Sequence, residues 1–309
     1  MKDTFWLKTT DDTEIYVKRW FNPNQRPKAI VQLAHGMVEH IERYDIFSSN
    51  LLEQGIFVYG NDHRGHGQTG LRYDSLGYFA SEDGFLKVVD DLFLITSYIK
   101  KDYPDTPIFL LGHSMGSFLA RIYVQRYSKE IAGVILTGTG YTPLFLTTLG
   151  ITLARALSQR EESALMNHLV FGNYNKRINN PKKTHDWLTR DENVVQKFIT
   201  DPLCGFTPSA SYFHDLLTGI QLMQDNQRNS MIRTDLPMLF VSGTEDPVGN
   251  YGKGVWKTMN LYHQLGIDDI MVYFYEEARH EVLNEVNKEE VFDSIYQWII
   301  SKLKQMTFQ

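Results

Sequence analysis

Residues 108–118 have the sequence IFLLGHSMGSF, in which a short apolar run leads into the motif Gly-His-Ser-Met-Gly. The apolar run predicts a buried strand, and the residues that follow the motif predict a helix. A serine between such a strand and helix lies on a tight turn, so its neighbours must be small, as Gly112 and Gly116 are. The segment therefore predicts a strand-turn-helix unit that holds the Ser114 hydroxyl above the end of a sheet.

Alternating strands and helices are predicted on both sides of this unit. The predicted strands cover residues 15–20, 29–34, 56–59, 108–111, 133–137, 238–241 and 270–275. The predicted helices cover residues 44–54, 85–100, a stretch after Gly116, a stretch that ends at Tyr262, and residues 288–304. This alternation predicts an α/β fold with a doubly wound, mostly parallel sheet.

The middle of the chain has a different pattern. Residues 142–208 show no strand alternation; they open with an apolar, helix-like segment and pass through a polar stretch at 173–183. We therefore expect an inserted helical cap at 142–208 between two parts of one core, residues 1–141 and 209–309. Residues 209–224 also look helical, and the sequence alone does not decide whether they belong to the cap or to the core.

Composition excludes several classes of function. The 309 residues carry a formal net charge of −6 and no basic block interleaved with aromatics, so we expect no nucleic-acid partner. The single cysteine, Cys204, can form neither an internal disulfide nor a Cys-based metal site, which fits a reducing cytoplasm. The N-terminus lacks the apolar stretch of a secretory signal, and no apolar run approaches the roughly 20 residues that span a bilayer. We expect at most peripheral membrane contact, no metal and no cofactor, and the oligomeric state is left open.

A serine hydroxyl is a weak nucleophile that needs a histidine base and a carboxylate to orient that histidine. In folds of this kind the chain order is serine, acid, histidine. The turn after the strand at 238–241 offers two acids, Glu245 and Asp246. We favour Asp246, because Pro247 restricts it to an extended backbone. The loop after the strand at 270–275 offers His280 as the base, whereas the other early and middle histidines lie before Ser114, beside it, or in and near the cap.

Acyl transfer also needs two N–H donors aimed at the developing oxyanion. One donor comes from the residue after the nucleophile, which is Met115. The other comes from the loop after an early strand, here the loop after residues 29–34. Met37 is our candidate, because Gly36 lets the backbone turn the next N–H inward.

Five segments resemble the monoglyceride lipase and lysophospholipase branch of the α/β-hydrolases, a serine aminopeptidase-type group, in its bacterial form. The matching segments are residues 35–40 (HGMVEH) with Arg43 and Tyr44, 62–67 (DHRGHG), 112–116 (GHSMG), 243–248 (GTEDPV) and 278–281 (ARHE). The resemblance implies an α/β-hydrolase fold with a mobile cap over an apolar cleft. It implies hydrolysis of a monoacylated lipid or similar small-molecule ester without a cofactor, with Ser114, Asp246 and His280 as triad and Met37 and Met115 as oxyanion donors. One departure is Met37-Val38, where animal monoglyceride lipases have a small Ala-Gly pair, which predicts a narrower entrance.

Candidate substrate contacts come from both cap and core. The cap opens with an apolar segment that includes Phe145, Leu146 and Leu149, and we hypothesise that it lines an acyl-chain cleft. The alternative is that this face packs the cap onto the core. Gly36 and His113, beside the oxyanion loop and the nucleophile, are further candidates for substrate contact.

Other interpretations stay open at this point. The His and Asp residues at 62–67 could suggest a metal site, but a glycine-stiffened loop with a paired Arg64 explains them without one. Asp90 and Asp91 are expected to form a charged surface. The same triad could cleave an amide, as an aminopeptidase does. A catalytically inactive binding protein is the alternative of a different class, and the intact Ser114, Asp246 and His280 argue against it.

Overall fold

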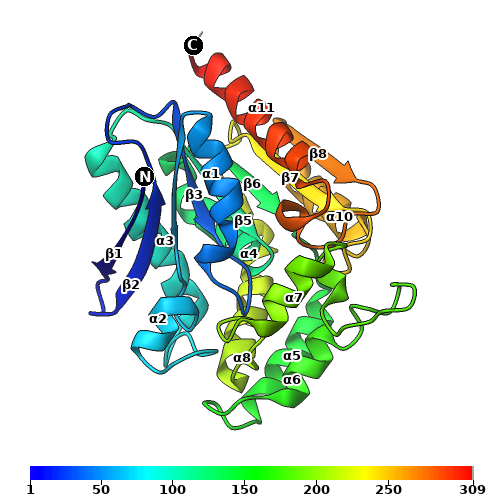
Figure 1. Ribbon diagram of the computed structural model, residues 1–309. Coiled ribbons are helices and arrows are strands. Elements are labelled where there is room, and N and C mark those ends of the chain that lie inside the picture. Colours follow the sequence, from blue (N-terminus) through cyan, green and yellow to red (C-terminus); the bar gives the residue numbers. More distant parts are fainter. Residues whose placement is uncertain (308–309) are drawn as a thin grey trace.

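One eight-stranded, mostly parallel sheet organises the chain (Figure 1). The computed structural model describes residues 1–307. The strands are β1 (Lys2–Lys8), β2 (Glu14–Trp20), β3 (Ala29–Ala34), β4 (Ile56–Asn61), β5 (Ile108–His113), β6 (Gly133–Thr137), β7 (Met238–Gly243) and β8 (Ile270–Tyr275). Their order is β1-β2-β4-β3-β5-β6-β7-β8, with β2 antiparallel to both β1 and β4 and all other pairs parallel. The predicted α/β-hydrolase fold is thereby confirmed.

Helices cover both faces of the sheet. The α-helices are α1 (Asp45–Glu53), α2 (Gly67–Arg72), α3 (Gly84–Asp102), α4 (Met115–Tyr127), α5 (Leu144–Arg155), α6 (Ala164–Phe171), α7 (Glu192–Thr200), α8 (Ala210–Met223), α9 (Asn226–Asn229), α10 (Lys253–Gln264) and α11 (Lys288–Thr307). The 3-10 helices are η1 (Ile41–Tyr44), η2 (Ser128–Glu130), η3 (Asp186–Leu188) and η4 (Val282–Asn284). Helices α1 and α11 pack on one face, and α3, α4 and α10 pack on the other (Figure 1).

Strand β5 shows how the sequence separates the two faces. Successive side chains of a strand point to opposite sides of its sheet. Ile108 and Leu110 accordingly join the core under α3 and α4, while Phe109 and Leu111 join the core under α1 and α11. Because both faces are covered, every residue of β5 is buried. A continuous apolar run, rather than an alternating one, is therefore what a central strand of this sheet requires.

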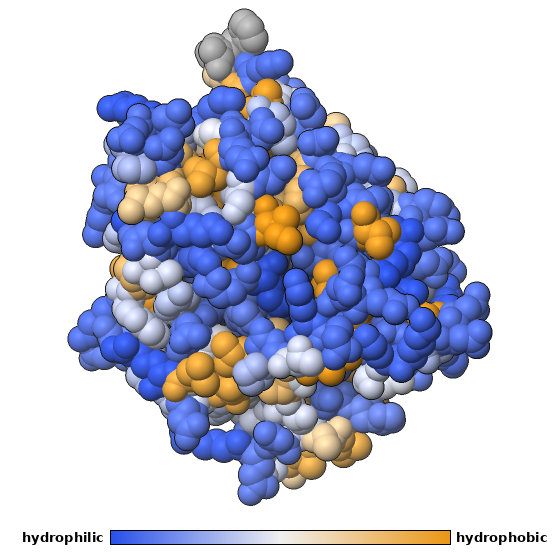
Figure 2. Space-filling view, viewed as in Figure 1, coloured by the Kyte–Doolittle hydropathy of each residue, from blue (hydrophilic) through white to orange (hydrophobic). Residues whose placement is uncertain are grey.

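The segment between β6 and β7 contains α5, α6, η3, α7, α8 and α9, and the helices α5 to α8 stand beyond one end of the sheet (Figure 1). Helix α8 contacts α5 and also the core helices α3 and α4. It therefore touches both parts, and the division at residue 208 stays a proposal. Apolar residues lie among hydrophilic ones over α5 and α6 (Figure 2). The exposed members are Leu144, Phe145, Leu146, Leu149, Leu165 and Leu169.

Two features differ from what the sequence pattern indicates. Strand β1 was not predicted; it is an edge strand whose residues alternate between exposed and half-buried, so it lacks an apolar signal. Asp90 is exposed as expected, but the expectation of a charged surface is wrong for Asp91, which is buried. Arg64 donates to both Asp91 oxygens at 2.7 and 2.9 Å and also pairs with Asp11, so Asp91 fixes the loop after β4.

No helix among the described residues is both long and apolar enough to cross a membrane.

Candidate active site

Ser114 lies on a tight turn between β5 and α4. Its backbone has φ 53° and ψ −119°, a conformation that costs energy for a residue with a side chain. The turn is possible because its neighbours are glycines: a Cβ on Gly112 would lie 2.3 Å from the Gly116 carbonyl oxygen. A Cβ on Gly116 would lie 2.0 Å from the carbonyl oxygen of Ala34 in β3. The local sequence thus holds Ser114 at the N-terminus of α4, close to the end of β3.

Asp246 and His280 meet on the loops that follow β7 and β8. His280 Nδ1 lies 2.9 Å from Asp246 Oδ1, and both side chains are buried. The Val248 N–H donates to the same oxygen at 2.8 Å, which fixes the carboxylate. Burial lowers the pKa of His280, but the charge and hydrogen bond of Asp246 outweigh burial, and the pKa rises above its ordinary value. Glu245, the competing acid, is exposed.

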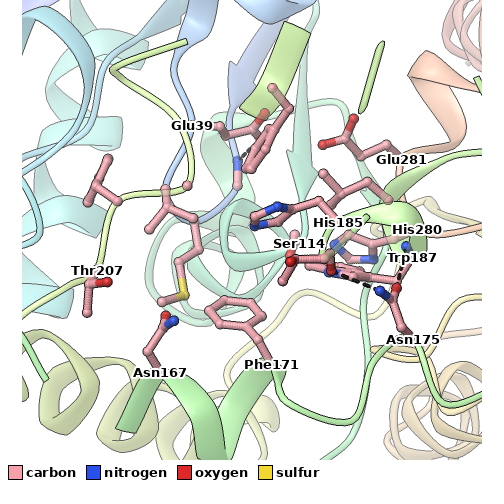
Figure 3. Close-up of a pocket in the computed structure, with 18 of the residues that line it drawn as sticks. Glu39, Ser114, Asn167, Phe171, Asn175, His185, Trp187, Thr207, His280 and Glu281 are labelled. Carbon is pink, nitrogen blue, oxygen red and sulfur yellow. Dashed lines mark hydrogen bonds between the residues drawn. The ribbon is translucent and has the colours of Figure 1, made fainter. Parts of the chain in front are cut away.

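The structure brings all three predicted residues to one place. Ser114 and His280 line the same cavity, and Figure 3 shows them side by side. The Nδ1 side of the His280 ring faces the Asp246 carboxylate, so Nε2 is left for the serine. In the described part of the chain the Ser114 hydroxyl makes no hydrogen bond. Such catalytic bonds are often long before a substrate binds.

The loop after β3 passes close to the nucleophile. A Cβ on Gly36 would lie 3.3 Å from the Ser114 Cβ. Across residues 1–307 neither the Met37 nor the Met115 N–H has an acceptor in the protein. Val38 has φ 50°, a strained value for a β-branched residue, and its carbonyl accepts the Gly205 N–H from the cap at 2.9 Å. The geometry thus leaves two N–H groups free near Ser114.

A buried ion cluster ties this loop to the His280 loop. Arg43 pairs with Glu39 and donates two parallel bonds to Glu281, at 2.6 and 2.7 Å. Glu39 also accepts the Gly36 N–H and the Tyr44 hydroxyl, each at 2.6 Å. Burial raises the pKa of Glu39, but Arg43 and the other donors outweigh it, so the net pKa is lowered. Sequence reasoning missed this role of Arg43 and Glu281, because the two residues lie 238 positions apart and no spacing rule pairs them.

Two cavities meet at Ser114. One, of about 320 Å³, has a mixed lining of polar side chains and apolar ones such as Phe171, Trp187 and Phe206; we call it the polar cavity for its polar side chains. The other, of about 710 Å³, is lined mainly by apolar residues of α4, α5, α6 and α8. Both are bordered by Ser114 and Met37. The polar lining of the first includes His113, His168 and Thr184. It also includes Asn167, Asn175, His185 and Thr207 (Figure 3). The nucleophile therefore stands between a mainly apolar space and one that also offers polar side chains.

The predicted substrate contacts divide between these cavities. Gly36 and His113 line the polar cavity, and Leu146 and Leu149 line the apolar one. Phe145 lines neither and is 69% exposed. Burial, together with nearby His280, lowers the pKa of His113 to about 4, so its ring is neutral at neutral pH. Substrate contact by the four cavity residues stays a proposal.

Cap residues around the polar cavity were not found from sequence. The Trp187 ring lies 5.0 Å from the His280 ring. The backbone carbonyl of Trp187 accepts the backbone N–H of His280 at 3.4 Å. Asn175 Oδ1 accepts the Trp187 N–H at 2.9 Å (Figure 3). These residues come from a segment with no recognisable motif, so only the structure identifies them as part of the site.

One group of side chains could hold a metal ion. His40, Asp201 and Cys204 place their ligand atoms within 4.8 Å of one another. His40 Nε2 and Asp201 Oδ2 already bond to each other at 2.9 Å, and this pair links the loop after β3 to the cap. Burial raises the pKa of the Cys204 thiol, so it stays protonated at neutral pH. The contacts within the cluster are satisfied without an ion.

Comparisons with known proteins cover nearly the whole chain. Residues 25–287 match the family Hydrolase_4, described as serine aminopeptidase, S33. The monoacylglycerol lipase of Mycolicibacterium smegmatis is 25% identical over 292 residues, 92% of each chain. The monoglyceride lipase of Mus musculus is 29% identical over 299 residues, 91% of this chain and 88% of that one. Phospholipase YtpA of Bacillus subtilis is 26% identical over 281 residues, 88% of this chain and 95% of that one. The structure of a thermostable carboxyl esterase from Bacillus coagulans with glycerol superposes with a TM-score of 0.91 at 26% identity. The match covers 98% of this chain and 99% of that one.

The two acids of the turn after β7 give a direct test of the site. We expect Asp246→Asn to lower kcat on a soluble p-nitrophenyl ester by a factor on the order of 10³ to 10⁴, because His280 loses the carboxylate that orients it. The matched control is Glu245→Gln at the preceding residue, whose kcat should stay within about twofold of the parent value because Glu245 is exposed. Steady-state kinetics check both variants, and a larger loss in Glu245→Gln would contradict the assignment.

Proposed function

Because this chain belongs to the serine aminopeptidase S33 family and is an α/β-hydrolase related to monoglyceride lipases and esterases, we propose that it hydrolyses carboxylic esters of monoacylated lipids through an acyl-enzyme. The observation that carries the proposal is the position of Ser114 between a mainly apolar cavity and the polar cavity, whose mixed lining supplies hydrogen-bonding side chains. An ester with a long acyl chain and a short polar alcohol has the same division at its carbonyl carbon. Such a substrate fits both spaces at once.

The proposed reaction uses the three residues in turn. His280 Nε2 takes the hydroxyl proton of Ser114 while Oγ attacks the ester carbonyl carbon. The Met37 and Met115 N–H groups stabilise the negative charge on the carbonyl oxygen. His280 then gives its proton to the leaving alcohol, and an acyl-Ser114 ester remains. A water molecule, deprotonated by His280, attacks that ester, and the carboxylic acid leaves as Ser114 regains its proton.

The apolar cavity supports an acyl chain of substantial length. Its lining includes Phe118, Leu153, Val170, Leu217 and Ile220, all apolar side chains. Burying each methylene of an acyl chain there contributes about 0.8 kcal/mol. Leu146 and Leu149 line this cavity and are also exposed, so it reaches the surface of the cap. We infer that the acyl chain enters from that surface, which would make any membrane contact peripheral.

The polar cavity favours a neutral alcohol over a phosphorylated one. Among the described residues that line it, none is Lys or Arg, and Glu39 and Glu281 lie at its border. Arg43 is held between these two carboxylates and is not part of the lining. A phosphate would thus lose water without gaining a cationic partner. Hydroxyl groups can bond to the Asn, Thr and His side chains, so a monoacylglycerol fits better than a lysophospholipid.

A panel of three substrates of matched acyl length tests the proposal: a monoacylglycerol, a lysophosphatidylcholine and an acyl amide. We expect kcat/KM to be highest for the monoacylglycerol. It should exceed the value for the lysophospholipid at least roughly tenfold, because the phosphate of the lysophospholipid must lose its water beside carboxylates. Ser114→Ala serves as the inactive control. Preference for the amide would favour an aminopeptidase-like enzyme, and turnover of none of the three would contradict the proposal in favour of a binding protein.

A substitution inside the apolar cavity tests where the acyl chain lies. Val170→Trp should fill part of the space and exclude about two methylenes, a loss of about 1.6 kcal/mol or roughly 15-fold in kcat/KM for a long-chain ester. Acetate esters should be hydrolysed within about twofold of the parent rate. Val286→Trp, at a site 58% exposed and outside the cavity, is the matched control. Equal losses of kcat/KM on short and long esters would mean that the acyl chain does not lie in this cavity.

A further inference from the structure

The carbonyl of Gly36 is held by the side chain of the preceding residue. His35 Nδ1 lies 2.7 Å from the Gly36 carbonyl oxygen. A carbonyl oxygen only accepts, so Nδ1 must carry a proton. The described chain has no cis peptide bond, and in a planar trans peptide the N–H points opposite to the C=O. The Met37 N–H, which shares its peptide with the Gly36 carbonyl, therefore points away from the His35 ring.

The second ring nitrogen of His35 fixes the tautomer. The backbone N–H of His63 donates to His35 Nε2 at 3.1 Å. Since an N–H only donates, Nε2 must be unprotonated, and the two bonds together select the neutral ring with its proton on Nδ1. Burial, with the neighbouring His66, lowers the pKa of His35 well below its ordinary value, in agreement with a neutral ring.

The loop after β4 builds the surroundings of His35. The rings of His35 and His63 are 4.0 Å apart, and His63 Nε2 lies 3.2 Å from the His35 carbonyl oxygen. Asn61 Nδ2 lies 3.2 Å from His63 Nδ1, which completes the bonding of that ring. Both rings are fully buried. Of the two histidines at 62–67 that suggest a metal site in the sequence, His63 thus holds His35, and His66 packs against its ring while bonding to the Arg64 carbonyl and the Tyr212 hydroxyl.

Gly36 needs this support because its own backbone is permissive. Its N–H is held by Glu39 Oε1 at 2.6 Å, and its C=O is held by His35, so the peptides on both sides are fixed by side chains. Without the His35 bond, no other described residue would hold the Gly36 carbonyl, and rotation of the Gly36–Met37 peptide would turn the Met37 N–H away.

We propose that His35 is a positioning residue of the oxyanion hole: as the Nδ1-protonated neutral ring, it holds the Gly36–Met37 peptide so that the Met37 N–H faces the reacting carbonyl at Ser114. This inference rests on the proposed serine-hydrolase function. Gly36 packs against Ser114, and Met37 borders both cavities, so this N–H is near the reacting atoms. His35 touches no substrate and transfers no proton.

Two substitutions separate the hydrogen bond from the volume of the ring. Asparagine also carries a nitrogen donor at its δ position, so His35→Asn can keep the bond to the Gly36 carbonyl, whereas His35→Leu cannot. Removing one oxyanion donor costs on the order of 10²- to 10³-fold in kcat, and misdirecting one should approach the lower part of that range. We expect His35→Leu to lower kcat for an ester about 10- to 100-fold with KM within about twofold, and His35→Asn to recover most of the loss.

A transition-state analogue distinguishes this role from general support of the fold. An alkyl boronic acid, which forms a tetrahedral adduct with the serine, should bind to His35→Leu more weakly by the same factor as kcat falls. Active-site titration corrects for inactive protein. Unchanged kcat per active site, or an analogue affinity that does not fall, would overturn the proposal.

A measurement on the unmodified protein covers the case in which His35→Leu does not fold. Nitrogen-15 NMR of the histidine rings at neutral pH should find His35 protonated at Nδ1 and unprotonated at Nε2. A proton on Nε2, or on both nitrogens, would overturn the inference. If the parent protein hydrolyses no ester and Ser114→Ala changes nothing, the proposed function fails instead, and that outcome is distinct from an active enzyme that is insensitive to His35→Leu.

Discussion

The close approach of α4 to β3 is the constraint on which the rest of the site depends. Gly116 leaves no room for a side chain against the Ala34 carbonyl, and Gly112 leaves none against Gly116. The N-terminus of α4 is therefore pressed against the end of β3. This contact strains Ser114, and it also brings Met115 next to the loop that carries Met37. Two N–H donors from segments far apart in sequence can converge on one point only because both glycines are present.

Buried polar side chains then hold the surrounding loops at fixed positions. Glu39, Arg43 and Glu281 form a cluster between the loop after β3 and the loop of His280. Burying three charges is costly unless each is paired and hydrogen-bonded, and here the bidentate Arg43–Glu281 contact and the bonds to Glu39 meet that condition. We expect this cluster to fix geometry: it holds the loop of His280 and the loop of Met37 at a constant distance from each other, although the two loops follow strands that are not neighbours.

Sequence patterns predict the core well and the cap poorly, for physical reasons. Buried parallel strands need continuous apolar runs, which are visible in the chain, whereas the edge strand β1 needs none and was missed. Asp246 and His280 follow from chain order because functional groups collect at the carboxyl ends of the strands. The cap lacks such a rule: Leu146 and Leu149 share a face of α5 and line the apolar cavity, while Phe145 points elsewhere. His185 and Asn175 are assigned only by their place in space.

The central claim is that Ser114 is an activated nucleophile in a cavity open to small molecules. The most direct measurement is mass spectrometry of the protein after treatment with an alkyl fluorophosphonate, followed by mapping of the modified peptide. The account predicts a single phosphonate on Ser114, absent in Ser114→Ala and strongly slowed in His280→Ala, because the hydroxyl needs its base. An intact protein that takes up no phosphonate, or takes it up on a residue other than Ser114, would contradict the account.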